Sequence, residues 1–362
     1  MNKSLSAQKT ILYLAHRSLC AKMKNMWGYE IPFEYEGYQA EHLTTRERVS
    51  IFDSCYMGEF RISGKTAFDD LDKIVTCNIS SLNANQCKYS FICNEEGGVI
   101  DICVIYRIAK DKFLLVVNAE NKHQVFTWIM DHKSENTVIT DISDITSKLD
   151  LQGPESLHLL SKIIKDPLQN FHYCHFRYDY YKSTKILISR TGYTGELGFE
   201  IFCPHDIALS LWNDFLLSGA KPAGSGCLNT LRIEMGFPII GYELDAKRAA
   251  YETGYTHLFD FTKLFIGSDK QLQKSILSGI IINDSTDVAK GDVIVSDNNH
   301  SVGLITSACF SPTLQEHIAL GYVLRHYSNP GTELIVTTKK KKLNGKISEL
   351  PFYKNATFKN CI

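Results

Sequence analysis

The segment from Ser189 to Ile201, SRTGYTGELGFEI, places three glycines and two carboxylates around the end of a short apolar strand. Its glycines, Gly192, Gly195 and Gly198, recur at every third residue. That spacing suits turns with positive φ or a close approach to a flat ligand, and it suits neither a helix nor a plain strand. The segment therefore predicts a loop that faces a ligand.

Glu200 is the acid of this segment best suited to bind that ligand. It stands between Phe199 and Ile201, where a buried carboxylate is costly unless it is paired. A carboxylate at the base of a pocket can accept two parallel hydrogen bonds from neighbouring N–H groups. Glu200 is therefore either a ligand-binding residue or a strand residue paired within the protein. Glu196, four residues earlier, is expected to serve the turn.

The composition is that of an ordinary soluble globular protein, with 362 residues, 44% hydrophobic and 22% charged. Thirty-nine basic and 40 acidic residues give a formal charge of -1, so no overall field favours nucleic acid or an anionic membrane. The apolar runs have the length of strands and fall short of a membrane span. We expect a protein without a nucleic-acid or membrane partner, located in the cytoplasm, or in the mitochondrial matrix if the host is eukaryotic.

The 11 cysteines are scattered from Cys20 to Cys361 without a CxxC pair. This pattern indicates neither a disulfide framework nor a zinc site, and it is typical of reduced core residues. Cys55 has no histidine and acid beside it in the sequence, so a nucleophilic role is not expected.

The elements that must position these residues follow an α+β order. Apolar spacing predicts a helix from Thr10 to Met23, and an extended aromatic segment and a polar helix follow it. From Phe60 short strands alternate with helical patterns, which suits antiparallel sheets with helices on one face, and a second such block runs from about Lys148 to Asp245.

From Gly279 onward the pattern is all-β and predicts a small C-terminal barrel. Within it, Leu343, Asn344 and Gly345 carry a strong hairpin signal, so we expect the turn there, with the lysine run 339–342 at its solvated tip.

Together with the glycine segment, seven further blocks in order closely resemble the folate-binding aminomethyltransferases, the T-protein family of the glycine cleavage system. The blocks are FDSCYMGEF (52–60), NEEGGVIDICVIY (94–106), LVVNAEN (115–121), LQGPES (151–156), LRIEMGFPIIGYELD (231–245), VGLITSACFSPTLQEHIALGYV (302–323) and LPF (350–352). The resemblance implies three domains arranged like a cloverleaf around a central channel. They would comprise residues 1–55 with 146–250 as a folate-binding α+β domain, 56–145 as an α+β domain lining the channel, and 270–362 as the barrel.

The resemblance also implies the reaction. The lipoyl arm of a partner, the H-protein, would deliver a sulfur-bound aminomethyl group, ammonia would leave, and the carbon would bridge two nitrogens of tetrahydrofolate. No metal is implied. Such a site must orient a pterin, place a carboxylate near the reacting nitrogens, and admit a long flexible arm.

Six residues are implied to hold the folate. Glu200 would anchor the pterin, and the others would wall the slot: Met57, Tyr89, Val116, Asn118 and Tyr193. Flat aromatic ligands are commonly held by apolar walls with one amide for orientation.

The sequence departs from the family at the reacting centre. Where members read GGxxDD this chain reads GGVIDI, so Ile102 replaces the acid credited with catalysis and Asp101 keeps the other. Adjacent strand residues point to opposite faces, so Asp101 could act in its place only through a bulge or a slip of one residue. Leu228 and Asn229 replace an Arg-Asp pair whose arginine reaches the pterin.

Two further positions are expected to have structural roles and no part in catalysis. His257 stands where the family has a channel tryptophan, and a lone histidine is more often a packing residue than a base. Arg232 is expected to be scaffold, paired with an acid such as Glu234 or Asp245.

The leading hypothesis is thus an aminomethyltransferase that uses tetrahydrofolate and a lipoylated H-protein, with Asp101 as the candidate catalytic acid. The alternative is a T-protein-like folate-binding protein that has lost or changed the reaction, including a folate-dependent demethylase. A relative that assists iron-sulfur cluster assembly is disfavoured, because YETGYTHLF from Tyr251 lacks the cysteine and lysine of that group.

Overall fold

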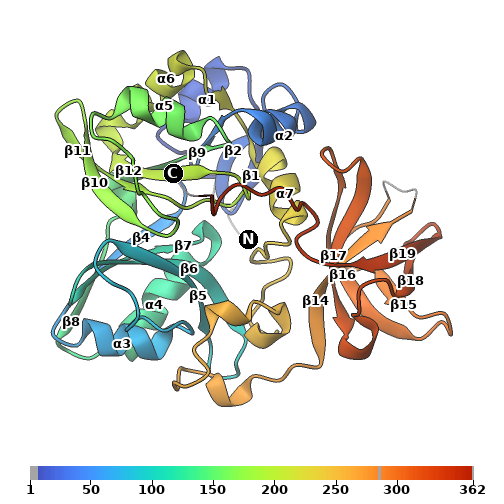
Figure 1. Cartoon of the computed structure of the whole chain (residues 1–362). Coiled ribbons are helices and arrows are strands. Elements are labelled where there is room, and N and C mark those ends of the chain that lie inside the picture. The colour runs from blue at the N-terminus through green and yellow to red at the C-terminus, as the bar shows by residue number, and fades with distance from the viewer. Residues whose placement is uncertain (1–6, 284–286, 361–362) are drawn as a thin grey trace, which may run out of the picture.

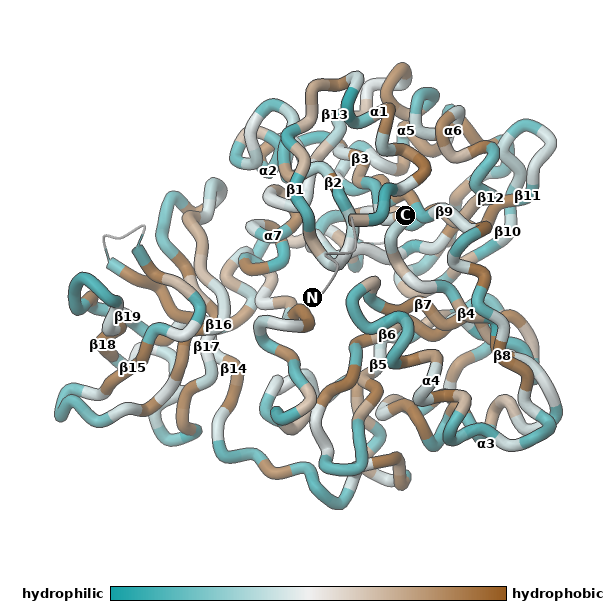
Figure 2. The backbone as a smooth tube through the Cα atoms, turned by 180° about the vertical axis from the view of Figure 1, so that it is seen from behind, coloured by the Kyte–Doolittle hydropathy of each residue, from teal (hydrophilic) through white to brown (hydrophobic). Residues whose placement is uncertain are grey.

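The computed structural model describes residues 7–283 and 287–360. Three lobes surround a common centre (Figure 1), two of them built on open sheets with helices and the third a closed barrel. Figure 2 shows the same three lobes from behind, with α7 between the barrel and the rest of the molecule.

The first lobe is built on a six-stranded sheet in the order β10-β11-β12-β9-β3-β13, antiparallel except for β13 beside β3. Alternating apolar residues such as Leu149 and Phe199 face Trp212 in its core, because one side of each strand must be buried. The strands are β3 (Ser50–Asp53), β9 (Thr146–Gln152), β10 (Phe176–Tyr181), β11 (Thr184–Ser189), β12 (Gly198–Pro204) and β13 (Lys221–Pro222). The helices of this lobe are α1 (Tyr13–Ser18), α5 (Ser156–Ile163) and α6 (His205–Ser218).

The predicted first helix is shorter than its apolar spacing suggested. It ends at Ser18, because Cys20 has a φ of 58°, in the left-handed region that a helix does not continue. The chain then forms the hairpin of β1 (Lys22–Met26) and β2 (Tyr29–Glu34), followed by the predicted polar helix α2 (Tyr38–Glu47).

Helix α7 (Ser225–Glu234) packs against α2 and β2 on one side and against the barrel on the other. It is therefore the element through which the first lobe meets the barrel.

The second lobe is a five-stranded antiparallel sheet in the order β5-β6-β7-β4-β8. Helices α3 (Ala67–Ile74) and α4 (Lys122–His132) cover one face, as predicted, and the other face meets the first lobe through Tyr106, Val116 and Phe202. The strands are β4 (Gly58–Gly64), β5 (Gln86–Cys93), β6 (Val99–Ala109), β7 (Lys112–Val117) and β8 (Thr137–Asp141).

The third lobe is the predicted all-β barrel, closed in the order β14-β17-β16-β15-β18-β19. Its strands are β14 (Ser275–Ile282), β15 (Val293–Val295), β16 (Ser301–Ser311), β17 (Glu316–Leu324), β18 (Glu333–Thr337) and β19 (Lys342–Ser348). The remaining short elements are 3₁₀ turns: η1 (Ala119–Asn121), η2 (Ser143–Ile145), η3 (Ala250–Thr253), η4 (Thr256–Leu258), η5 (Ser268–Lys270) and η6 (Arg325–Tyr327).

The hairpin turn expected at Asn344 and Gly345 was wrong. Both residues lie inside β19, and the turn comes earlier, where the Thr338 N–H donates to the Lys341 carbonyl at 3.0 Å. A side chain at position 345 would press on Ile280 inside the barrel, so this glycine allows close strand packing where the barrel closes.

The three sheets lie within the three predicted domains. The exact boundaries of those domains stay a prediction: residues 1–55 with 146–250, residues 56–145, and residues 270–362.

Candidate functional site

A cavity of about 120 Å³ lies between the five-stranded and six-stranded sheets. One water molecule needs only roughly 10–15 Å³, so this cavity can hold a ligand larger than water. All six residues predicted to contact the ligand line it: Met57, Tyr89, Val116, Asn118, Tyr193 and Glu200. Residues separated by more than a hundred positions therefore meet at one site.

One wall of the cavity is the face of the second sheet that its helices leave uncovered. Tyr89 of β5 is paired with Val104 of β6, and Val104 is paired with Val116 of β7, so the three side chains share that face. Met57, just before β4, and Ile102 extend the same apolar surface. Such a wall suits a flat ring system.

The opposite wall carries charge. Lys148 of β9 is fully buried, and its Nζ lies 2.7 Å from the Glu200 Oε1 and 2.7 Å from the Asp150 Oδ1. Burial lowers the pKa of the Lys148 ammonium, but Asp150 and Glu200 have the larger effect and raise that pKa above its usual value. Tyr106 and Thr191 each donate a hydrogen bond to the Glu200 Oε2. The paired interpretation of Glu200 is thus correct, and its carboxylate also lines the cavity.

Lys148 and Asp150 are site residues that the sequence reasoning missed. They stand two positions apart in β9 and so share a face, and Ser54 donates to the Asp150 Oδ2 at 2.7 Å. Burial raises the pKa of Asp150 to about 6, although Lys148 lowers it. Charged residues at alternate positions of a strand rich in leucine were the available signal.

Glu59 is a second acid that the sequence reasoning missed. It pairs with Val116 across β4 and β7, is 1% exposed, and has no hydrogen-bond partner for either carboxyl oxygen among the described residues. Burial raises the pKa of its carboxyl well above the usual range, so the uncharged form is favoured beside the cavity wall.

The glycine segment serves packing more than ligand contact, and among its loop residues Tyr193 alone lines the cavity. A Cβ at Gly192 or Gly198 would overlap the amide group of Gln152, and one at Gly195, where φ is 87°, would overlap Met235. Gly192 and Gly198 thus let the loop fold tightly over β9, and Gly195 has the positive φ that the spacing predicted; that the loop faces a ligand stays a prediction.

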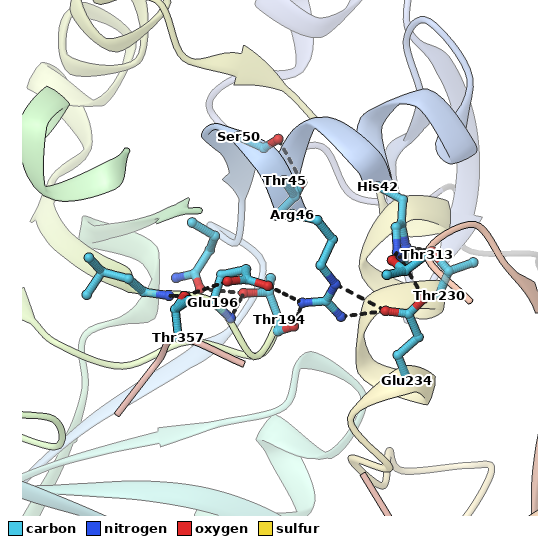
Figure 3. Close-up of polar contacts among 12 residues, drawn as sticks. His42, Thr45, Arg46, Ser50, Thr194, Glu196, Thr230, Glu234, Thr313 and Thr357 are labelled. Atoms are coloured by element: carbon cyan, nitrogen blue, oxygen red, sulfur yellow. Dashed lines mark hydrogen bonds and ion pairs between the residues drawn. The ribbon is translucent and has the colours of Figure 1, made fainter. Parts of the chain in front are cut away.

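A buried ionic network fixes the far side of this loop (Figure 3). Arg46 of α2 donates to the Thr194 carbonyl at 2.7 Å and to the Glu196 Oε1 at 2.8 Å, and its Nη2 lies 2.7 Å from the Glu234 Oε2 of α7. Glu196 therefore serves the turn, as expected. Thr357 donates to the Glu196 Oε2, so the segment that follows the barrel returns to this loop.

His42 closes the network toward the barrel. Its Nδ1 lies 2.7 Å from the Thr230 Oγ1 and its Nε2 lies 2.8 Å from the Thr313 Oγ1 (Figure 3). Burial raises the pKa of Glu234, but hydrogen bonding and charge from His42 and Arg46 outweigh it and lower that pKa to about 2. The network thereby ties α2, α7, the glycine segment and the barrel together.

The chain matches two family models in sequence order. Residues 12–263 match the GCVT N-terminal domain, and residues 277–354 match the glycine cleavage T-protein C-terminal barrel domain. An aminomethyltransferase of Halothermothrix orenii is 33% identical over 95% of this chain and 99% of its own, and one of Clostridium botulinum is 38% identical over 93% and 94%. The chain belongs to the glycine cleavage T-protein family of aminomethyltransferases.

The fold agrees with this family. The crystal structure of the glycine cleavage system aminomethyltransferase T of Bartonella henselae superposes with a TM-score of 0.91, at 25% identity over 98% of this chain and all of that one. The predicted family, the T-protein-like fold and the assignment as an aminomethyltransferase enzyme are confirmed. None of the helices among the described residues is long and apolar enough to cross a membrane. The same residues contain no group of three or more side chains placed to hold a metal ion.

Of the two residues where the resemblance places the catalytic acid, Ile102 lines the cavity and Asp101 does not. The carboxylate of Asp101 is fully buried behind Asn118, accepting from its backbone N–H at 2.9 Å and from its amide at 2.8 Å. The sheet is irregular just before Asp101, where Asp101 pairs with Ile92 and Val99 with Cys93, yet Ile102 still faces the cavity. A catalytic role for Asp101 stays a prediction.

The other departures from the T-protein pattern also have defined places. Leu228 lines the cavity, whereas Asn229, next along α7, accepts from the Arg232 Nε at 3.0 Å. Arg232 pairs with Glu243 at 2.7 Å and donates to Ser307 of the barrel. The expected pairing of Arg232 with an acid is confirmed, but the acid is Glu243 and neither Asp245 nor Glu234, which Arg46 and His42 already occupy.

His257 and Cys55 carry no chemistry at this site. His257 is exposed and does not line the cavity. Burial raises the pKa of the Cys55 thiol well above its usual value, which disfavours the thiolate that a nucleophile requires. The described cysteines are free, and most of them are buried, as the sequence predicted.

Asp101 yields a pH-dependent prediction. Burial raises its pKa to about 7, although hydrogen bonds from Asn118 lower it. Between about pH 4 and pH 7 the folded state therefore holds a proton that the unfolded state has lost, and the free energy of unfolding falls as the pH rises. Asp101→Asn should remove a decline on the order of 4 kcal/mol, measured by urea denaturation across that range. The exposed Asp131→Asn is the control, and equal slopes in the wild type and Asp101→Asn would contradict the prediction.

Proposed function

We propose that this chain transfers the aminomethyl carbon carried by the lipoyl arm of an H-protein to tetrahydrofolate, with release of ammonia. The observation that carries the proposal is the meeting of all six predicted folate contacts at one cavity. Family membership supports the same assignment, since the relatives named above are aminomethyltransferases.

In this proposal the pterin lies against the apolar wall of Met57, Tyr89 and Val116. Glu200 accepts hydrogen bonds from the pterin amino and ring N–H groups: its Oε1 has one acceptor site free beside Lys148, and at its Oε2 the second N–H replaces the longer hydrogen bond from Tyr106, at 3.2 Å. Asn118, held by Asp101, supplies an amide that orients the ring.

The reaction moves two protons and changes no oxidation state, so it needs no redox partner. The N–H protons of the two folate nitrogens are replaced by bonds to the transferred carbon, and they leave on the lipoyl sulfur and on ammonia. Lys148, Asp150 and Glu200 form a buried ionic group. Its fixed charges, in place of bulk water, stabilise charge that develops at this wall during the reaction.

We place the protein in the cytoplasm, or in the mitochondrial matrix of a eukaryotic host.

Calorimetric titration with tetrahydrofolate and turnover with aminomethyl-loaded H-protein test the proposal. We expect saturable binding, and formation of methylene-tetrahydrofolate and ammonia in equal amounts above the rate without enzyme. Binding with no catalysed turnover would overturn the transfer step. It would favour the alternative of a folate-binding protein that has lost or changed the reaction, because Ile102 and Leu228 replace the usual acid and arginine. Absence of binding would overturn the folate assignment itself.

A further inference from the structure

Two cysteines from different lobes lie side by side near the cavity. Gln86, at the start of β5, forms an antiparallel bridge with His175, in the loop before β10. The next residue pair in that register is Cys87 and Cys174, and the Cys87 N–H donates to the Cys174 carbonyl at 2.8 Å. Cys174 has a φ of 60° and ends the regular pairing, but a hydrogen-bonded pair of antiparallel residues has Cα atoms about 5.5 Å apart, within the span that a disulfide bridges.

The two thiols differ in accessibility. Cys87 is 1% exposed, with its Sγ 3.8 Å from the Ser189 Oγ, whereas Cys174 is only half-buried. A hydrogen bond from Cys87 lowers the pKa of the Cys174 thiol, against the effect of burial and with help from Tyr173. Burial raises the pKa of Cys87 well above its usual value. An accessible thiol of lowered pKa beside a second cysteine is the arrangement typical of redox-sensitive pairs.

We propose that Cys174 and Cys87 form an oxidisable pair that closes to a disulfide between the two lobes flanking the cavity. The oxidant is a hydroperoxide. The Cys174 thiolate attacks the peroxide oxygen, the O–O bond breaks, and the protonated leaving oxygen departs as water or an alcohol, leaving a sulfenic acid. The Cys87 sulfur then attacks the Cys174 sulfur, its proton leaves with the hydroxyl group as water, and the S–S bond forms.

The position of the pair links it to the pocket. Cys87 is the β-sheet partner of Tyr106, whose hydroxyl donates to Glu200, and Tyr89, two residues along β5, lines the cavity. A disulfide here would fix the spacing of the walls that carry Tyr89 and Glu200. The chemistry of the pair does not depend on which ligand the cavity binds.

Peptide mass spectrometry of the reduced, full-length protein after treatment with hydrogen peroxide tests the proposal. We expect a cross-linked peptide pair containing Cys87 and Cys174, lighter by two hydrogen atoms and reversed by dithiothreitol. The oxidised protein should melt roughly 5 °C or more above the reduced one, because the link joins distant parts of the chain.

Three variants make the test specific. In Cys87→Ser, Cys174 should accumulate sulfenic acid that a dimedone reagent traps, and in Cys174→Ser, Cys87 should remain a thiol. Cys309→Ser, at another half-buried cysteine, should leave the cross-link unchanged. The proposal is overturned if Cys174 reacts no faster than Cys309, or if either cysteine pairs preferentially elsewhere in the wild-type chain.

Discussion

Replacing Glu200 by alanine is expected to weaken tetrahydrofolate binding about 100-fold or more. Two hydrogen bonds from pterin N–H groups to a carboxylate are worth roughly 3 kcal/mol together, and each 1.4 kcal/mol is a factor of ten in affinity. The variant also leaves Lys148 with Asp150 as its remaining carboxylate partner, so the charged wall is weakened as well. Calorimetric titration of the purified variant measures the effect.

Two variants separate a specific role of Glu200 from loss of fold. Glu200→Gln keeps the volume and one acceptor oxygen, and it should bind with an intermediate affinity. Glu120 also lines the cavity but is exposed, so Glu120→Ala should change the affinity little. Equal affinities of the wild type and Glu200→Ala, with melting curves showing both folded, would remove Glu200 from the binding site.

Replacing Arg46 by methionine is expected to lower the free energy of unfolding by about 3–5 kcal/mol. The guanidinium is the cation shared by Glu196 and Glu234, and it also lies 4.0 Å from the centre of the Tyr353 ring. Removing it leaves two buried carboxylates without that partner, which costs far more than the loss of an exposed ion pair. Urea denaturation at neutral pH gives the difference.

Arg48 provides the matched control for Arg46. Its side chain is 71% exposed and its contact with Glu155 is long, at 3.6 Å. Arg48→Met should therefore cost no more than about 1 kcal/mol. Equal losses in the two variants would show that the Arg46 network contributes nothing beyond a surface charge.

The six predicted contacts share one cavity because the strands that carry most of them follow local rules, whereas their binding of folate stays a prediction. Tyr89 and Val116 lie in strands whose side chains alternate between two faces, so one face of each strand was expected to point inward. The resemblance then placed these positions at the same site as Glu200. The barrel could also be predicted from the sequence, since its strands are short apolar runs separated by turns.

What the sequence could not reveal depends on contacts between distant residues. Lys148 meets Glu200 only because β9 and β12 are neighbours in the sheet, and His42 meets Glu234 across 192 positions of the chain. Asn344 and Gly345 carried a strong local signal for a turn, but pairing with β18 and barrel closure overrode it. The packing role of Gly192 and Gly198 was hidden for the same reason, because the side chain of Gln152 that requires them lies far away in sequence.

The return of Thr357 to the glycine segment has a consequence for biosynthesis. Its hydroxyl donates to Glu196 and accepts from the Leu197 N–H, and its own N–H donates to the Gly195 carbonyl at 3.0 Å. A nascent chain that has released residues up to Pro222 from the ribosome can assemble both sheets, yet it still lacks these three hydrogen bonds. These three hydrogen bonds of the glycine loop would thus form only after the entire barrel has been translated, so ribosome-bound fragments truncated before Thr357 would hold the loop through Arg46 without them.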